Sequence, residues 1–167
     1  MKLKLKSRNH IKREKRCKQT AEVFTPPALV NEMLDKLPEE VWQPEKTFLD
    51  PSSGNGNILE EVLRRKLKHG HDPLQALSTI YGVDIMADNI KECRLRLLKL
   101  ISESGFEITR AMIATVLNNV VLTPIGEKYP KGALNYDFSF PKKTAEHHKC
   151  VDRWMRGIRE ENWLAEV

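Results

Sequence analysis

The alternation of apolar and polar residues between positions 47 and 85 predicts a strand, a turn, a helix and a second strand. The apolar run "TFL" at 47–49 is typical of a short buried strand, and "STIYGVDI" at 78–85 predicts another. Between them, apolar residues recur near every 3.6 positions, as on one face of a helix, at Ile58, Leu59, Val62, Leu63 and Leu67. Strands that alternate with helices favour an α/β fold with a parallel sheet.

The rest of the chain continues this alternation. Residues 86–105 predict a helix that begins with Asp88 or Asn89 as N-cap and stops at Gly105. A helix-like segment at 107–117 and a strand-like run "NNVVL" at 118–122 follow. Residues 144–167 predict an amphipathic C-terminal helix, which we expect to pack on the sheet rather than bind a partner. The predicted divisions are therefore a basic arm at 1–20, an α/β domain at 21–143 and the helix at 144–167.

The turn "DPSSGNGN" at 50–57 joins the first strand to its helix. Gly54 and Gly56 permit strained backbone angles and a close approach of a ligand to the helix N-terminus, although a glycine turn with nothing bound is equally common. A phosphate-binding P-loop is excluded because Asn57 and Ile58, rather than Lys and Ser or Thr, follow Gly56. A dinucleotide motif would need a third glycine, where the chain has Leu59.

An acidic residue at the end of the second strand narrows the choice of ligand. The carboxylate of Asp84 suits the two hydroxyls of a ribose. The pattern therefore favours a nucleoside ligand that has no pyrophosphate.

Composition and charge add a second feature, at the N-terminus. The chain has 167 residues, 40% of them hydrophobic, which fits one domain with a core, and its net charge is +5. Residues 1–18 hold nine basic residues and Glu14, a net +8, which leaves −3 for the remainder. Such an arm is either a solubilising tail or a contact for nucleic-acid phosphates. The candidate DNA contacts are Lys2, Lys4, Lys6, Arg8, Lys12, Arg13, Lys15, Arg16 and Lys18.

Several classes of protein are disfavoured. The sequence has no apolar run of about 18 residues or more and no signal-peptide pattern, so we expect a cytoplasmic protein without a membrane span. Its three cysteines, Cys17, Cys93 and Cys150, are isolated from one another, which argues against a disulfide framework. The "HHKC" at 147–150 lacks a fourth ligand, and we expect no metal.

Three motifs resemble one family. "LDPSSGNGNIL" at 49–59 resembles the D-P-x-x-G-x-G motif I of S-adenosylmethionine-dependent N6-adenine DNA methyltransferases of the type I and type IIG modification-subunit branch. "YGVDI" at 81–85 resembles their motif II, and "AEVFTPPALVNEML" at 21–34 their motif X. The resemblance implies a partial doubly wound, Rossmann-like methyltransferase sheet with flanking helices. It also implies a role in restriction-modification and S-adenosyl-L-methionine as the cofactor.

The same resemblance implies a set of site residues. Asp50, Gly54 and Gly56 would surround the methionine part of the cofactor, and Asp84 would take the ribose. Residues of motif X would close the pocket from the other side. The full implied cofactor set is Phe24, Thr25, Pro26, Asp50, Pro51, Ser52, Gly54, Gly56, Asn57, Asp84 and Ile85. Because a ligand would meet the backbone at Gly56, we expect Gly56→Val to impair cofactor binding more than folding.

The chain departs from the family at the catalytic motif. The [D/N/S]-P-P-[Y/F/W] sequence of motif IV is not found, since Pro26-Pro27 belongs to motif X and is followed by Ala28. Gly132 stands where motif III has an acid. The catalytic residues are therefore unknown. We expect a SAM-binding, adenine-N6 methyltransferase-like protein that contacts DNA and is incomplete, or that needs a partner chain or a divergent motif IV to act. A partner chain and a homodimer are both open as assemblies. The alternative is a catalytically inactive DNA-binding or regulatory module that keeps the fold.

Overall fold

The structure is a computed structural model that describes residues 23–122 and 145–159. Its elements are α2 (Pro27–Asp35), the 3-10 helix η1 (Glu39–Trp42), β1 (Phe48–Asp50), α3 (Asn57–Lys68), α4 (Pro73–Ser78), β2 (Ile80–Asp84), α5 (Ala87–Glu103), α6 (Arg110–Asn119), β3 (Val120–Leu122) and α7 (Ala145–Arg159). The basic arm predicted at 1–20 and the motif III region around Gly132 lie outside the described residues.

The three described strands form one parallel sheet in the order β1-β2-β3. Leu49 of β1 pairs with Tyr81 of β2, and Val83 of β2 pairs with Val121 of β3. The strands share one direction, so their carboxyl ends meet at one edge of the sheet. The predicted mixed α/β fold with a parallel sheet is confirmed at this level.

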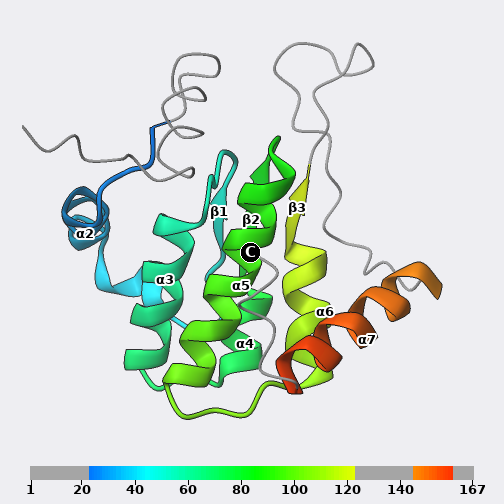
Figure 1. The fold of residues 1–167 in the computed structure, drawn as a ribbon. Coiled ribbons are helices and arrows are strands. Elements are labelled where there is room, and N and C mark those ends of the chain that lie inside the picture. Colours follow the sequence, from blue (N-terminus) through cyan, green and yellow to red (C-terminus); the bar gives the residue numbers. More distant parts are fainter. Residues whose placement is uncertain (1–22, 123–144, 160–167) are drawn as a thin grey trace, which may run out of the picture.

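Two amphipathic helices cover one face of the sheet (Figure 1). Helix α3 contacts β1 and β2, α5 contacts β2 and β3, and the two helices also contact each other. Their apolar faces supply much of the core, including Leu59, Leu63, Leu98 and Ile101, which are all almost fully buried. The helices bury these faces because apolar residues removed from water stabilise the fold.

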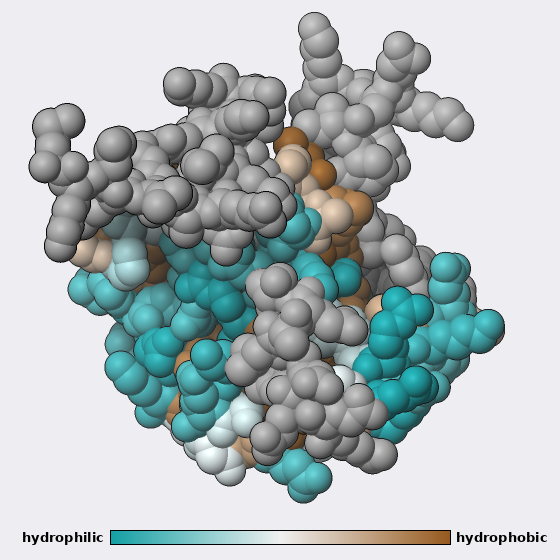
Figure 2. All heavy atoms as spheres, in the orientation of Figure 1, coloured by the Kyte–Doolittle hydropathy of each residue, from teal (hydrophilic) through white to brown (hydrophobic). Residues whose placement is uncertain are grey.

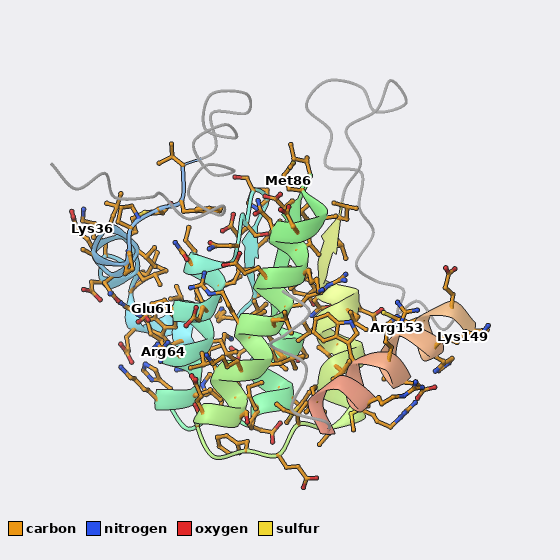
Figure 3. All side chains as sticks on the ribbon, in the orientation of Figure 1. Lys36, Glu61, Arg64, Met86, Lys149 and Arg153 are labelled. Atoms are coloured by element: carbon orange, nitrogen blue, oxygen red, sulfur yellow. The ribbon has the colours of Figure 1, made fainter. Side chains whose placement is uncertain are left out.

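The outward faces of these helices are polar. Figure 2 shows hydrophilic side chains over α3 and the upper part of α5, and hydrophobic residues near the carboxyl ends of β2 and β3. Glu61 pairs with Arg64 at 3.2 Å on the surface of α3, where Figure 3 labels both side chains. At the strand ends, Ile85 and Leu122 are about half exposed.

A lysine lies inside the core at the opposite end of the sheet. Lys66 on α3 is fully buried, and its ammonium donates hydrogen bonds to the carbonyl of Lys46 and the hydroxyl of Thr79, both at 2.8 Å. Burial lowers the pKa of Lys66, because the charged form loses its hydration. The amphipathic pattern does not distinguish this lysine from the solvated ones around it.

The crossover from α3 to β2 contains a helix that the sequence analysis did not predict. Helix α4 begins at Pro73, and the carboxylate of Asp72 accepts hydrogen bonds from the backbone N–H groups of Leu74 and Gln75. An Asp N-cap followed by proline at the first helical position is a standard start signal. That signal was present in "GHDPLQAL" at 70–77.

The boundaries of α5 correct a second prediction. Met86 is the N-cap, with extended backbone angles, and Asp88 lies within the first turn rather than before the helix. The Asp88 carboxylate therefore acts on the positive end of the helix dipole instead of capping it. Gly105, at φ +87°, follows the end of the helix as predicted.

The predicted C-terminal helix is present as α7. It packs mainly against α6, not against the sheet as we expected, and buries Val151 with Trp154, Met155 and Ile158 partly covered. Arg110 of α6 and Asp152 of α7 form an ion pair across this contact. No helix in the described part of the chain is long and apolar enough to cross a membrane.

Candidate functional site

The glycine turn is fastened to the end of the second strand by Asp84. One carboxylate oxygen of Asp84 accepts a hydrogen bond from the backbone N–H of Gly54 at 2.9 Å. The other accepts from the backbone N–H of Met86 at 2.7 Å, and Figure 3 labels Met86 at this edge of the molecule. The structure thus brings motif I and motif II together, although 30 residues separate Gly54 from Asp84.

Asp50, the last residue of β1, lies beside Asp84 at this edge. Burial raises the pKa of the Asp50 carboxyl, and the negative charge of Asp84 raises it further. The backbone N–H of Ser52 donates a hydrogen bond to Asp50 at 3.1 Å, which lowers the pKa in part. Two neighbouring carboxylates, one of them costly to ionise, would be stabilised by a cationic ligand. Pro51 and Ser52, which follow Asp50 in the chain and precede Gly54, are both exposed to solvent.

The segment before α2 closes on the same turn. The side-chain amide of Asn57 donates a hydrogen bond to the carbonyl of Thr25 at 2.8 Å. A Cβ built on Gly54, which has φ +51°, would lie 3.1 Å from the ring of Phe24. Pro26 follows as the N-cap of α2. Residues of motif X and motif I therefore contact each other directly.

Gly56 packs closely against helix α5. At φ +88°, a Cβ on Gly56 would lie 2.5 Å from the sulfur of Cys93, which is fully buried on α5. The space beside Gly56 is therefore filled by the neighbouring helix and is not open to a ligand in that direction. We expected Gly56→Val to impair cofactor binding more than folding, on the ground that its methyl groups would meet the ligand. The structure gives a different steric reason, because those methyl groups would enter the core beside Cys93 and harm folding directly.

An arginine on α5 holds the turn from the third side. Arg96 donates hydrogen bonds to the carbonyl of Asn55 at 3.2 Å and to the side-chain oxygen of Asn57 at 2.5 Å, and it forms an ion pair with Glu60. The side-chain amide of Asn55, which is almost fully buried, donates to Glu92 at 2.9 Å. Charge-assisted hydrogen bonds of this kind fix the loop geometry.

Sequence reasoning missed this network. In the sequence, Lys91, Arg94, Arg96 and Lys99 show only as the basic side of an amphipathic helix. Arg94 instead donates a hydrogen bond to the carbonyl of Val120 at 2.8 Å, which ties α5 to β3. No local pattern marks such partners, because Arg96 lies 39 positions after Asn57.

Among the described residues, no cluster of three or more His, Cys, Asp or Glu side chains could hold a metal ion. Cys93 and Cys150 are free thiols. Ile85 is 47% exposed just after Asp84. The polar groups of the site come from four segments of the chain: the segment before α2, the turn at 50–57, the end of β2, and α5.

Comparison with known proteins gives one relevant match. The chain is similar to a methyltransferase. It is 33% identical over 116 residues to the Type II methyltransferase M.VspI of Vibrio sp. (strain 343). The match covers 65% of this chain but 26% of M.VspI, so the chain spans about a quarter of that protein's length. No protein-family model and no solved structure matches the chain. The similarity supports a methyltransferase-like protein.

Proposed function

We propose that this chain binds S-adenosyl-L-methionine and forms the cofactor-binding part of a DNA adenine-N6 methyltransferase. The observation that carries the proposal is the convergence of the three resembling motifs at one edge of the sheet, through the contacts of Gly54 with Asp84 and of Thr25 with Asn57. These motifs are far apart in sequence, and nothing but the fold requires them to meet. The similarity to a Type II methyltransferase supports the same conclusion.

The charge of the site fits this cofactor. S-Adenosylmethionine carries a sulfonium and an ammonium group, and Asp50 and Asp84 place two carboxylates where β1 and β2 end. Burial and the charge of Asp84 raise the pKa of Asp50, so a bound ammonium would stabilise its ionised form. In this proposal Asp50 binds the methionine part of the cofactor. Asp84 offers its remaining lone pairs to the ribose while it holds Gly54.

The residues of this chain bind and orient the cofactor, which supplies the methyl group. Arg96 and Asp84 fix the turn, and Phe24 with Thr25 closes the site from the side of α2. The proposed sheet is one part of a doubly wound methyltransferase sheet. The proposed substrate is DNA, which the basic arm at 1–18 would contact through phosphates.

Isothermal titration calorimetry with S-adenosylmethionine and with its demethylated product tests the proposal. We expect binding by the full chain, and a loss of about tenfold or more in Asp50→Asn, because a hydrogen bond to a charged group contributes about 1.5–3 kcal/mol. Glu103→Gln is the matched control, since it removes one exposed carboxylate at the other end of α5. Absence of heat with both ligands, or equal affinity of Asp50→Asn and wild type, would refute the site.

A second function, a catalytically inactive DNA-binding or regulatory module, is favoured by one observation. The sequence contains no [D/N/S]-P-P-[Y/F/W] motif. Transfer of a labelled methyl group to DNA separates the two functions. Cofactor binding together with methyl transfer by the chain alone would exclude the inactive module. Cofactor binding without transfer would leave the chain as a binding subunit.

A further inference from the structure

Helix α7 carries a row of basic side chains on its solvent side. Lys149, Arg153 and Arg156 are all exposed, and their spacing of four and then three residues places them on one face of the helix. We name these three side chains the α7 basic stripe. Figure 2 shows hydrophilic side chains at the surface where α7 lies, and Figure 3 labels Lys149 and Arg153 on the helix.

Packing on the opposite face of α7 fixes the direction of the stripe. Val151 is buried, and Trp154 and Ile158 are partly covered, in the contact of α7 with α6. These apolar residues lie on the other side of the helix from the stripe, as in an amphipathic helix that covers a core. The stripe therefore stays turned to solvent as long as α7 is docked on α6.

The acidic residues of α7 do not neutralise the stripe. Asp152 is engaged by Arg110 of α6 in an ion pair. Glu146 lies in the first turn of the helix, where a carboxylate stabilises the positive end of the helix dipole. Within the described part of the chain, no ion pair involves the three side chains of the stripe. Their charges are available to an external partner.

The rest of the described chain has the opposite charge. Residues 23–122 contain eleven basic and fourteen acidic residues, a net −3, whereas the α7 sequence has four basic and two acidic residues, a net +2. Some exposed cations of the larger part are already in ion pairs, such as Lys36 with Glu32 at 2.8 Å and Lys99 with Glu103 at 3.5 Å. Basic side chains gathered on one helix face are typical of a nucleic-acid contact.

We infer that the α7 basic stripe binds the phosphate backbone of duplex DNA, at a surface separate from the candidate cofactor site. Figure 1 shows α7 beside α6, on the side of the molecule away from α2 and α3, whereas the glycine turn joins β1 to α3. This inference rests on the proposed function, in which DNA is the substrate. It adds a contact on the folded part of the chain to the one proposed for the basic arm at 1–18.

The length of the stripe fits a phosphate backbone. Seven residues separate Lys149 from Arg156, which is about 10 Å along the helix axis at about 1.5 Å per residue. One strand of B-DNA presents a phosphate about every 3.4 Å along the duplex axis. The stripe can therefore reach two or three successive phosphates. Contacts of this kind position the duplex and carry no sequence information.

The test measures binding of the full chain to a short fluorescent DNA duplex by fluorescence anisotropy over a salt series, without S-adenosylmethionine. Its failure is therefore distinct from failure of the cofactor to bind in calorimetry. The test variant is Arg153→Gln/Arg156→Gln, because glutamine has nearly the helix propensity of arginine. We expect the slope of log affinity against log salt to become shallower by roughly 1.8, which is roughly 0.9 for each lost phosphate contact. The change should be the same for duplexes of unrelated sequence.

Two further variants make the test specific. Lys36→Gln/Lys99→Gln is the matched control, since it removes the same charge from two exposed lysines that are paired with glutamates. It should keep the wild-type slope. Arg153→Lys/Arg156→Lys keeps both charges and should also keep most of the slope. Thermal melting followed by circular dichroism should be alike for all variants, because the changed side chains are exposed.

Three outcomes would overturn the inference. They are an unchanged slope in Arg153→Gln/Arg156→Gln, an equal loss of slope in the matched control, and a change that depends on the duplex sequence. If the double variant melts below wild type, the single variant Arg153→Gln takes its place, with an expected change of roughly 0.9. Cosedimentation with phosphatidylserine vesicles that the glutamine variant loses, together with an unchanged DNA slope, would assign the stripe to a lipid surface instead.

Discussion

Gly56→Ala should destabilise the fold more than the same change at glycines of similar backbone conformation. In the left-handed conformation at φ +88°, an alanine would lower the free energy of unfolding by about 1–2 kcal/mol. Its Cβ would also lie 2.5 Å from the sulfur of Cys93, which is fully buried and cannot move into solvent. Overpacking of a core costs about 1–3 kcal/mol. The expected loss is about 2–5 kcal/mol, a large part of the 5–15 kcal/mol that typical domains have.

Two other glycines isolate the steric part. Gly70 and Gly105 have φ +80° and +87°, and a Cβ on either would meet nothing within 4 Å. Gly70→Ala and Gly105→Ala should therefore lose only the conformational part, about 1–2 kcal/mol. Urea denaturation followed by circular dichroism gives the free energy of unfolding for all three variants.

A double variant tests the contact itself. Burial raises the pKa of the Cys93 thiol to about 12, so Cys93 packs as a neutral group and Cys93→Ala removes only its sulfur. In Gly56→Ala/Cys93→Ala the loss should be smaller than the sum of the two single losses. Strict additivity, or equal destabilisation by Gly56→Ala and Gly70→Ala, would refute the packing role of Gly56.

Four further outcomes follow from the described contacts and the sequence. Arg96→Gln should loosen the turn, seen as faster amide exchange at 54–57 and weaker S-adenosylmethionine binding; the exposed Lys99→Gln should change neither, and equal effects would contradict a specific role of Arg96. The raised pKa of Asp50 means that its ionised form destabilises the fold above that pKa and that this cost disappears as pH falls through it. Asp50→Asn should therefore melt at a higher temperature than wild type at neutral pH, with the difference shrinking in acid; a lower melting temperature would contradict this assignment. Lys66→Ala should cost about 2–5 kcal/mol in urea denaturation, against less than about 0.5 kcal/mol for the exposed Lys68→Ala, and similar losses would show that Lys66 is not buried in solution. For each phosphate contacted, the logarithm of DNA affinity falls by roughly 0.9 for each tenfold rise in salt concentration. Deletion of residues 1–18 should make this slope shallower, and an unchanged slope would make the arm a solubilising tail.

Local patterns predicted the elements well where one face of the element is apolar. The apolar positions of the sequence predicted two strands and two helices correctly. They are β1 with Phe48, β2 with Ile80, α3 with Leu59 and α5 with Leu98. The short strand β3 lies within the predicted run at 118–122. Helix α4 was missed because its six residues are too few to show a helical period, although its N-cap is plain.

The site was predictable only in part, for a different reason. The motif residues were identified by resemblance, and the fold brings Gly54, Asn57, Thr25 and Asp84 into contact. The partners that hold them could not be predicted, since the contact of Arg96 with the turn spans about 40 positions and depends on how α5 crosses α3. The packing of Gly56 could not be predicted for the same reason, because its neighbour Cys93 belongs to another helix.

The glycine turn is held from three sides, by Asp84, by Arg96 and by the link from Asn57 to Thr25, and this has a kinetic consequence. Ordering a loop costs about 1–2 kcal/mol of backbone entropy per residue. In this protein that cost is met when the chain folds, so a ligand that binds the turn does not meet it again. Association should then be a single fast phase with no slow rearrangement behind it, and substitutions around the turn should change affinity chiefly through the dissociation rate.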